Sequence, residues 1–65
     1  MELKWTDSQD IALELLEKYP DVNPEFVRFT ELFDSVVKLA AFDDDPKQFN
    51  EAYLEAILGC WIDEK

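Results

Sequence analysis

The segment TDSQDIALELLEKYP, residues 6–20, decides the fold because it contains a helix start, an apolar face and a helix stop. Thr6 and Gln9 have the spacing of a capping box, in which each side chain accepts a backbone N–H that the first turn leaves free. Apolar residues then recur at helical spacing: Ile11, Ala12, Leu15, Leu16 and Tyr19. Since the residue before a proline disfavours helical backbone, Tyr19 is the last residue expected in this helix.

Two further helices are predicted by similar signals. Thr30 is the expected N-cap of the second helix. The apolar face of this helix is Leu32, Phe33, Val36, Val37 and Ala40, with Leu39 at its side. Asp45, Pro46 and Gln48 supply a cap, a first-turn proline and a D-x-x-Q box for a third helix that continues nearly to the C-terminus. Its inner face is Phe49, Tyr53, Leu54, Ile57, Leu58 and Trp61.

The remaining segments are short. Asn23 and Pro24 resemble a cap and a first-turn proline, which predicts one helical turn over residues 24–27. Residues 3–5 and 28–29 are expected to be extended and to pair with each other. At 65 residues the chain makes a single domain, residues 1–65. We expect a mainly α, three-helix domain related to the helix-turn-helix or to a reduced winged helix, with one or two very short strands.

Composition argues for a binding module over an enzyme. The chain has 16 acidic and 6 basic residues and a net charge of −10, which repels nucleic acid and attracts basic surfaces or cations. Solubility explains such a charge about equally well. There is no His, and Cys60 has no base to activate it, so a buried structural thiol is expected. Neither a signal peptide nor a membrane span is expected, which favours a cytoplasmic protein.

Acidic residues on the first predicted helix form the main candidate surface. Asp10, Glu14 and Glu17 are spaced i, i+4 and i+7, which places them in one stripe, and Asp7 and Asp21 extend it at the two ends. Like charges at this spacing destabilise an isolated helix, so a binding partner would explain why they are present. The alternative is an ordinary solvated face. We favour the functional interpretation because Lys18 is the only nearby cation on that face.

A second acidic group is Asp43, Asp44 and Asp45. Helix capping accounts for Asp45, and carboxylates at a helix N-terminus also complement the helix dipole. The triplet lacks the ligand spacing of an EF-hand. Carboxylates favour hard cations such as iron, but without His or clustered Cys such binding is expected to be weak. A protein-bound iron–sulfur cluster would need more thiols than the chain has.

Taken together, short segments spread over nearly the whole chain resemble the IscX family, also called YfhJ, of iron–sulfur cluster assembly proteins. The matching segments are LKWTD (residues 3–7), YPD (19–21), Pro24, VRFT (27–30), FDDDP (42–46), NE (50–51), LEAI (54–57) and WIDE (61–64). The resemblance implies a modified winged-helix fold and binding to the cysteine desulfurase IscS near the surface that bacterial frataxin uses. It also implies weak, exchangeable iron binding and a role as an adaptor or regulator.

We therefore expect an acidic adaptor that is monomeric and binds neither nucleic acid nor membrane. The expected partner-binding residues are Asp7, Asp10, Glu14, Glu17, Asp21, Asp43 and Asp44. Weak iron binding is assigned to Asp10, Glu14 and Glu17. The alternative is an iron carrier or sensor, in which iron is supplied to the assembly machinery or its level is reported to it.

Overall fold

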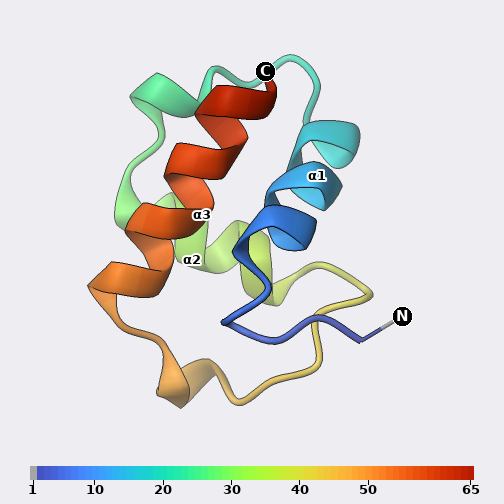
Figure 1. Ribbon diagram of the computed structural model, residues 1–65, viewed down its shortest axis with the longest axis vertical. Helices are drawn as coiled ribbons and strands as arrows, with labels where there is room; N and C mark the ends of the chain where they lie inside the picture. The colour runs from blue at the N-terminus through green and yellow to red at the C-terminus, as the bar shows by residue number, and fades with distance from the viewer. Residues whose placement is uncertain (1) are drawn as a thin grey trace.

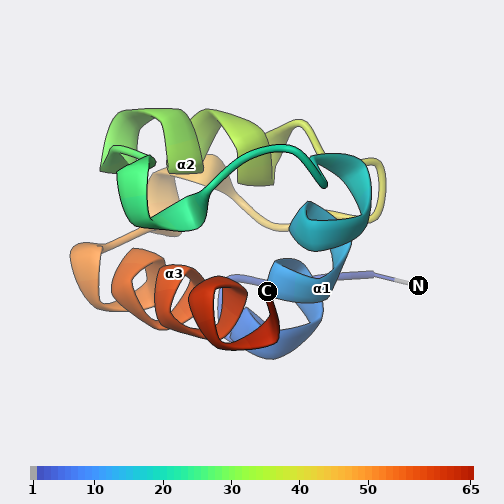
Figure 2. The ribbon, with the colours of Figure 1, turned by 90° about the horizontal axis from the view of Figure 1, so that it is seen from above.

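The computed structural model describes residues 2–65, and its regular elements are all helical. In chain order these are α1 (Ser8–Lys18), the 3₁₀ turn η1 (Pro24–Phe26), α2 (Phe29–Val37), the 3₁₀ turn η2 (Pro46–Gln48) and α3 (Glu51–Glu64). Figure 1 shows α1 and α3 running in the same general direction, while α2 crosses behind them. From above, α2 and η1 form one layer and α3 lies in the other (Figure 2). The predicted mainly α, three-helix class is confirmed.

The first helix starts later than its capping box predicts. Asp7, not Thr6, is the N-cap of α1, and no side chain caps this end. The Asp7 carboxylate turns backward and accepts the Lys4 N–H at 2.9 Å, while its carbonyl accepts the Ile11 N–H. A turn over residues 4–7 therefore takes the place that the Thr6–Gln9 box would occupy. The helix stops one residue before the predicted last residue, since α1 ends at Lys18 and Tyr19 is its C-cap.

The predicted pairing of residues 3–5 with residues 28–29 is wrong. Leu3 instead forms an isolated parallel bridge with Phe42. The Leu3 N–H donates to the Ala41 carbonyl at 2.8 Å, and the Asp43 N–H donates to the Leu3 carbonyl at 2.8 Å. Phe29 is already helical, so residues 28–29 are not a strand. Strand pairing in residues 2–65 is confined to this bridge, and the winged-helix detail is not confirmed.

The second helix also begins before its predicted cap. It starts at Phe29, after the extended residue Arg28, so Thr30 lies in the first turn and is not the N-cap. Leu32 and Val36 are fully buried, as predicted. The helix ends at Val37, so helical spacing no longer decides which residues beyond it face the core. Leu39, expected at the side of the apolar face, is buried, and Ala40, expected on that face, is exposed.

The third predicted helix is divided into two elements. Asp45 does act as a cap, since its carboxylate accepts the Lys47 N–H at 2.9 Å, but the element that it starts is only the turn η2. The chain is extended at Phe49 and Asn50, and α3 begins at Glu51. The Asn50 side chain accepts the Tyr53 N–H at 3.0 Å and is the true cap of α3. An Asn cap is sufficient to start a new helix, and this signal was missed.

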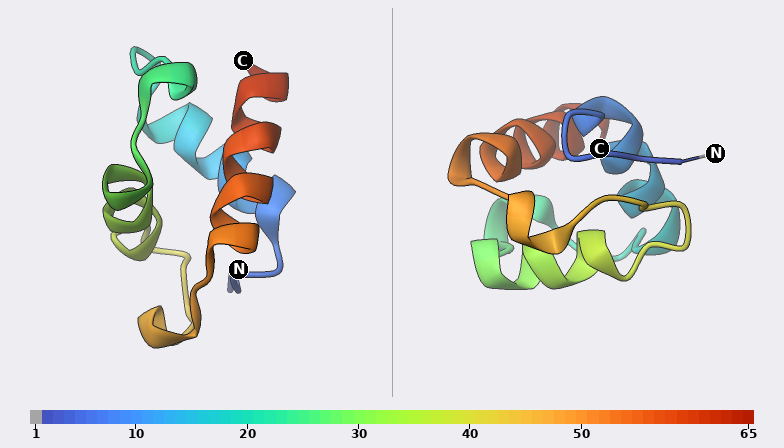
Figure 3. Two further views of the ribbon diagram at one scale, coloured as in Figure 1. Left: turned by 90° about the vertical axis from the view of Figure 1, so that its left-hand side faces the viewer. Right: turned by 90° about the horizontal axis from the view of Figure 1, so that it is seen from below.

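One core holds all three helices together. The buried residues of this core are Leu3, Trp5, Ile11, Ala12, Leu15, Leu32, Val36, Leu39, Leu54, Ile57 and Trp61, and Pro24 of η1 is buried as well. The central packing is between α1 and α3; the N-terminal part of α1 lies beside α3, and its C-terminal end turns away from it (Figure 3, left). Just after α3, the Lys65 ammonium donates to the carbonyls of Pro20 and Val22 at 2.8 and 2.9 Å. The C-terminal residue thus holds the loop that follows α1.

Candidate partner-binding surface

The predicted acidic residues fall into two groups with different surroundings. We call Asp10, Glu14 and Glu17 the α1 acidic face. The α-helix at Ser8–Lys18 is confirmed, so their spacing places these side chains on one side of α1. Asp10 and Glu17 are exposed and Glu14 is partly exposed, while Asp21 is exposed just beyond the helix. This helix is therefore a rigid support for three carboxylates.

The α1 acidic face has no ion pair within residues 2–65. The ion pair found in that range joins Lys4 and Asp43. Lys18, the cation nearest in sequence, lies over the ring of Tyr19, with its ammonium 5.6 Å from the ring centroid. The negative charge of α1 is thus left to solvent or to a partner.

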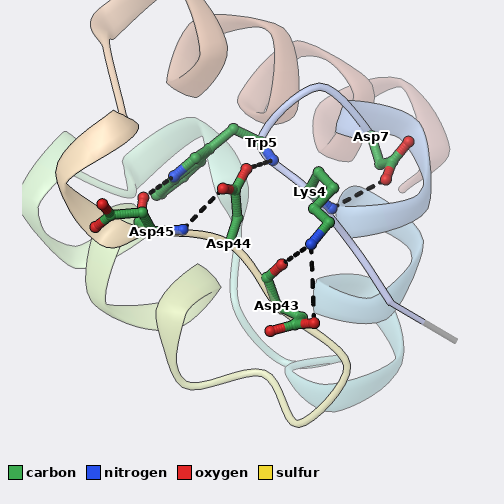
Figure 4. Close-up of polar contacts among 6 residues, drawn as sticks. All are labelled: Lys4, Trp5, Asp7, Asp43, Asp44 and Asp45. Atoms are coloured by element: carbon green, nitrogen blue, oxygen red, sulfur yellow. Dashed lines mark hydrogen bonds and ion pairs between the residues drawn. The ribbon is translucent and has the colours of Figure 1, made fainter.

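The second group forms what we call the N-terminal clasp, which comprises Lys4, Trp5, Asp7, Asp43, Asp44 and Asp45 (Figure 4). The Lys4 ammonium lies 3.8 Å from a carboxylate oxygen of Asp43 and also donates to the Asp43 carbonyl. The indole N–H of Trp5 donates to the Asp45 carbonyl at 2.9 Å. These contacts join the N-terminal segment to the loop before η2.

Asp44 lies at the centre of the clasp. Its carboxylate accepts the Trp5 backbone N–H at 3.1 Å and the Asp45 N–H at 2.8 Å. These two N–H groups, the Trp5 one first, hold the pKa of Asp44 below its ordinary value of 3.8; desolvation opposes them, and the charge of Lys4 makes a lesser contribution in the lowering direction. Asp7, Asp43 and Asp44 therefore all have a structural role in addition to any role in binding.

The clasp also fixes an aromatic cluster. The Trp5 ring is buried, stacks on Phe33 with centroids 5.8 Å apart, and meets Phe42 edge-on at 4.8 Å. Phe49 completes the cluster, 4.7 Å from Phe33 and 6.3 Å from Trp5. From the sequence, Trp5 is assigned only to the extended segment of residues 3–5. The signal for its role in the clasp is the Lys-Trp pair opposite an Asp-rich loop, which can be recognised only once the tertiary fold is known.

A preformed metal site is not found in the described residues. Across residues 2–65 no three or more Asp, Glu or Cys side chains are grouped so that they could hold a metal ion. Asp10, Glu14 and Glu17 share a helix face but do not converge on one point, so they do not fit a site with fixed geometry. Weak iron binding stays a prediction. Cys60 is partly buried.

None of the helices in residues 2–65 is long and apolar enough to cross a membrane.

Residues 3–65 match the family model described as "Iron-sulphur cluster assembly". The chain is also similar to a protein of Pseudomonas aeruginosa that is described as uncharacterized. The two are 48% identical over 65 residues, which cover 100% of this chain and 98% of the relative. With nearly its whole length matched, the chain belongs to the IscX (YfhJ) family of iron–sulfur cluster assembly proteins.

Proposed function

We propose that this protein is an acidic adaptor that docks on the cysteine desulfurase IscS and regulates iron–sulfur cluster assembly. Membership of the assembly family supports a role in iron–sulfur cluster assembly. The observation that carries the docking surface is the α1 acidic face, with carboxylates that have no ion pair in residues 2–65. A basic surface on the partner would supply the missing counter-charges.

Docking is assigned mainly to Asp10, Glu14, Glu17 and Asp21. The other predicted residues, Asp7, Asp43 and Asp44, accept hydrogen bonds or an ion pair within the clasp, so substituting them would also disturb the fold. A charged face on a rigid helix favours rapid, salt-sensitive association, since opposite potentials steer the encounter. Competition with bacterial frataxin for the same basic surface would then adjust the rate of sulfur delivery.

Charge reversal tests this assignment. We expect the double variant Glu14→Lys/Glu17→Lys to weaken binding to the desulfurase by about tenfold or more, as observed for the loss of charges that take part in docking. The matched control is Glu25→Lys/Glu31→Lys, which makes the same change in net charge at exposed positions in the layer of α2 and η1 (Figure 2). Equal losses from the two double variants would show that only the net charge matters, which would contradict the α1 face.

The second candidate function is an iron carrier or sensor. The unpaired carboxylates of α1 favour it, while the lack of a preformed cluster in residues 2–65 argues against a specific site. Anaerobic titration with Fe²⁺, followed by paramagnetic broadening of amide signals, separates the two candidates. Saturable broadening on α1 that Glu14→Gln/Glu17→Gln removes, and Glu25→Gln/Glu31→Gln does not, would support iron binding. Broadening that is not localised to any part of the chain would exclude the iron carrier or sensor and leave the adaptor as the remaining candidate.

A further inference from the structure

An apolar groove lies where the start of α3 meets α2, and the proposed function does not use it. Its volume is about 340 Å³, and its lining residues are Phe29, Thr30, Phe33, Asp34, Phe49, Glu51 and Leu54. The two views of Figure 3 show the chain between η2 and α3 passing beside α2, which brings these residues together. Phe49 is 45% exposed at the groove, although its ring is in contact with the aromatic cluster.

The groove combines an apolar floor with an acidic edge. Phe29, Phe33 and Leu54 supply apolar surface, and exposed Asp34 and Glu51 supply carboxylates. No Lys or Arg is among the lining residues. A ligand that fills this groove must therefore bring an apolar group and gains from positive charge beside it.

We propose that this groove binds a short segment of a partner protein, in which one aromatic or branched apolar side chain is flanked by Lys or Arg. The apolar side chain enters between α2 and the start of α3, and the flanking cations meet Asp34 and Glu51. A second copy of this chain is a poor occupant, because each copy has a net charge of −10. The site is separate from the α1 acidic face and does not depend on desulfurase docking.

A pair of peptides tests both parts of the recognition. The probes are acetylated, amidated KGKFKGK and its alanine-centred form KGKAKGK, which have the same charge. Binding is followed through the amide signals of the ¹⁵N-labelled, full-length protein. We expect saturable shifts at residues 29–34 and 49–54, and an affinity for the Phe peptide at least about tenfold higher than for the Ala peptide.

Two variants on the groove edge test the location. Asp34→Lys and Thr30→Arg place a cation at exposed lining positions, so each should lower the affinity for the Phe peptide by about tenfold. Glu25→Lys makes the same change in net charge as Asp34→Lys but lies outside the groove, and it should leave most of the affinity. Normal thermal unfolding of the variants would show that the fold is retained.

Several outcomes would overturn the proposal. Equal affinity for the two peptides, shifts confined to α1, or equal effects of Asp34→Lys and Glu25→Lys would each show non-specific attraction to an acidic protein. Shifts at residues 29–34 on concentrating the protein alone would identify a second copy as the occupant. The proposed function can fail separately: if the protein does not bind the desulfurase but still binds the Phe peptide in the groove, the proposed function is wrong and the groove assignment stands.

Discussion

The Asp44 carboxylate accepts the backbone N–H of Trp5 at 3.1 Å, across 39 positions of sequence. A second oxygen of the same carboxylate accepts the Asp45 N–H at 2.8 Å, and the Trp5 indole donates to the Asp45 carbonyl at 2.9 Å. One acidic residue thereby fixes both the position of the N-terminal segment and the path of the loop before η2. Part of the acidic character of this chain stabilises the fold, and only the remainder is left for a partner.

This relationship predicts a pH dependence of stability. The pKa of Asp44 is lower in the folded chain than its ordinary value of 3.8, so the unfolded chain binds more protons in the acid range. The contribution of Asp44 is complete above the ordinary pKa and is lost as the pH falls through the lowered one. We expect Asp44→Asn to be less stable than the parent near pH 7 and to lose less stability between about pH 5 and pH 3.

Urea unfolding at a series of pH values measures this effect. Asp21→Asn is the matched control, because Asp21 is an exposed carboxylate outside the clasp. A parallel pH profile for the parent and Asp44→Asn would show that the clasp does not bind the ionised carboxylate.

The two tryptophans predict unequal costs of the same substitution. Both are about 1% exposed, but the Trp5 indole N–H has a partner, whereas that of Trp61 has none within residues 2–65. Trp61→Phe removes a buried donor that lacks a hydrogen bond, while Trp5→Phe removes a hydrogen bond. We expect Trp5→Phe to be more destabilising, by about 1–2 kcal/mol in the free energy of unfolding.

Each of these variants keeps one tryptophan, so its fluorescence can be used to follow urea unfolding of either variant. A Trp61→Phe variant at least as unstable as Trp5→Phe would mean that loss of indole volume dominates over hydrogen bonding.

The contact of Lys65 with the loop after α1 predicts a contribution from the last residue of the chain. Its ammonium donates to the carbonyls of Pro20 and Val22, and both groups are at the surface, so the net value is modest. We expect Lys65→Met to lower the free energy of unfolding by about 1 kcal/mol. Lys47→Met, which removes a cation from another exposed position, should change it less. Equal effects would assign the loss to net charge alone.

The missed cap of α3 gives a further prediction. Asn50 accepts the Tyr53 N–H at 3.0 Å, so Asn50→Ala should destabilise the chain by about 1 kcal/mol. Thr6→Ala, at the position where the sequence predicted a cap for α1, should cost less because Thr6 does not cap the helix. Thermal unfolding of the two variants checks this, and a larger loss for Thr6→Ala would contradict the observed start of α1.

Patterns within one helix were readable from the sequence, and contacts between distant segments were not. Helical spacing correctly placed Ile11, Leu15, Ile57 and Trp61 in the core. The start of each helix was less predictable, because more than one residue near it could cap: Asp7 replaced Thr6, and Asn50 took over a role assigned to Asp45. A cap depends on the backbone entering the helix, and that path is set by tertiary contacts.

The candidate site shows the same division. Periodicity predicted that Asp10, Glu14 and Glu17 share one face of a helix, and the structure agrees. The capture of Asp7, Asp43 and Asp44 by the N-terminal clasp could not be predicted, since it depends on Leu3 pairing with Phe42. The expected partner of residues 3–5 was residues 28–29, which left the Asp-rich loop with helix capping and partner binding as its expected roles.

The most direct test of the central claim is calorimetric titration of the protein into the cysteine desulfurase of its organism at low and moderate salt. The account predicts saturable binding that weakens markedly as salt rises, because the α1 carboxylates supply the attraction. Binding that does not change with salt, or no binding in either buffer, would contradict docking through the α1 acidic face.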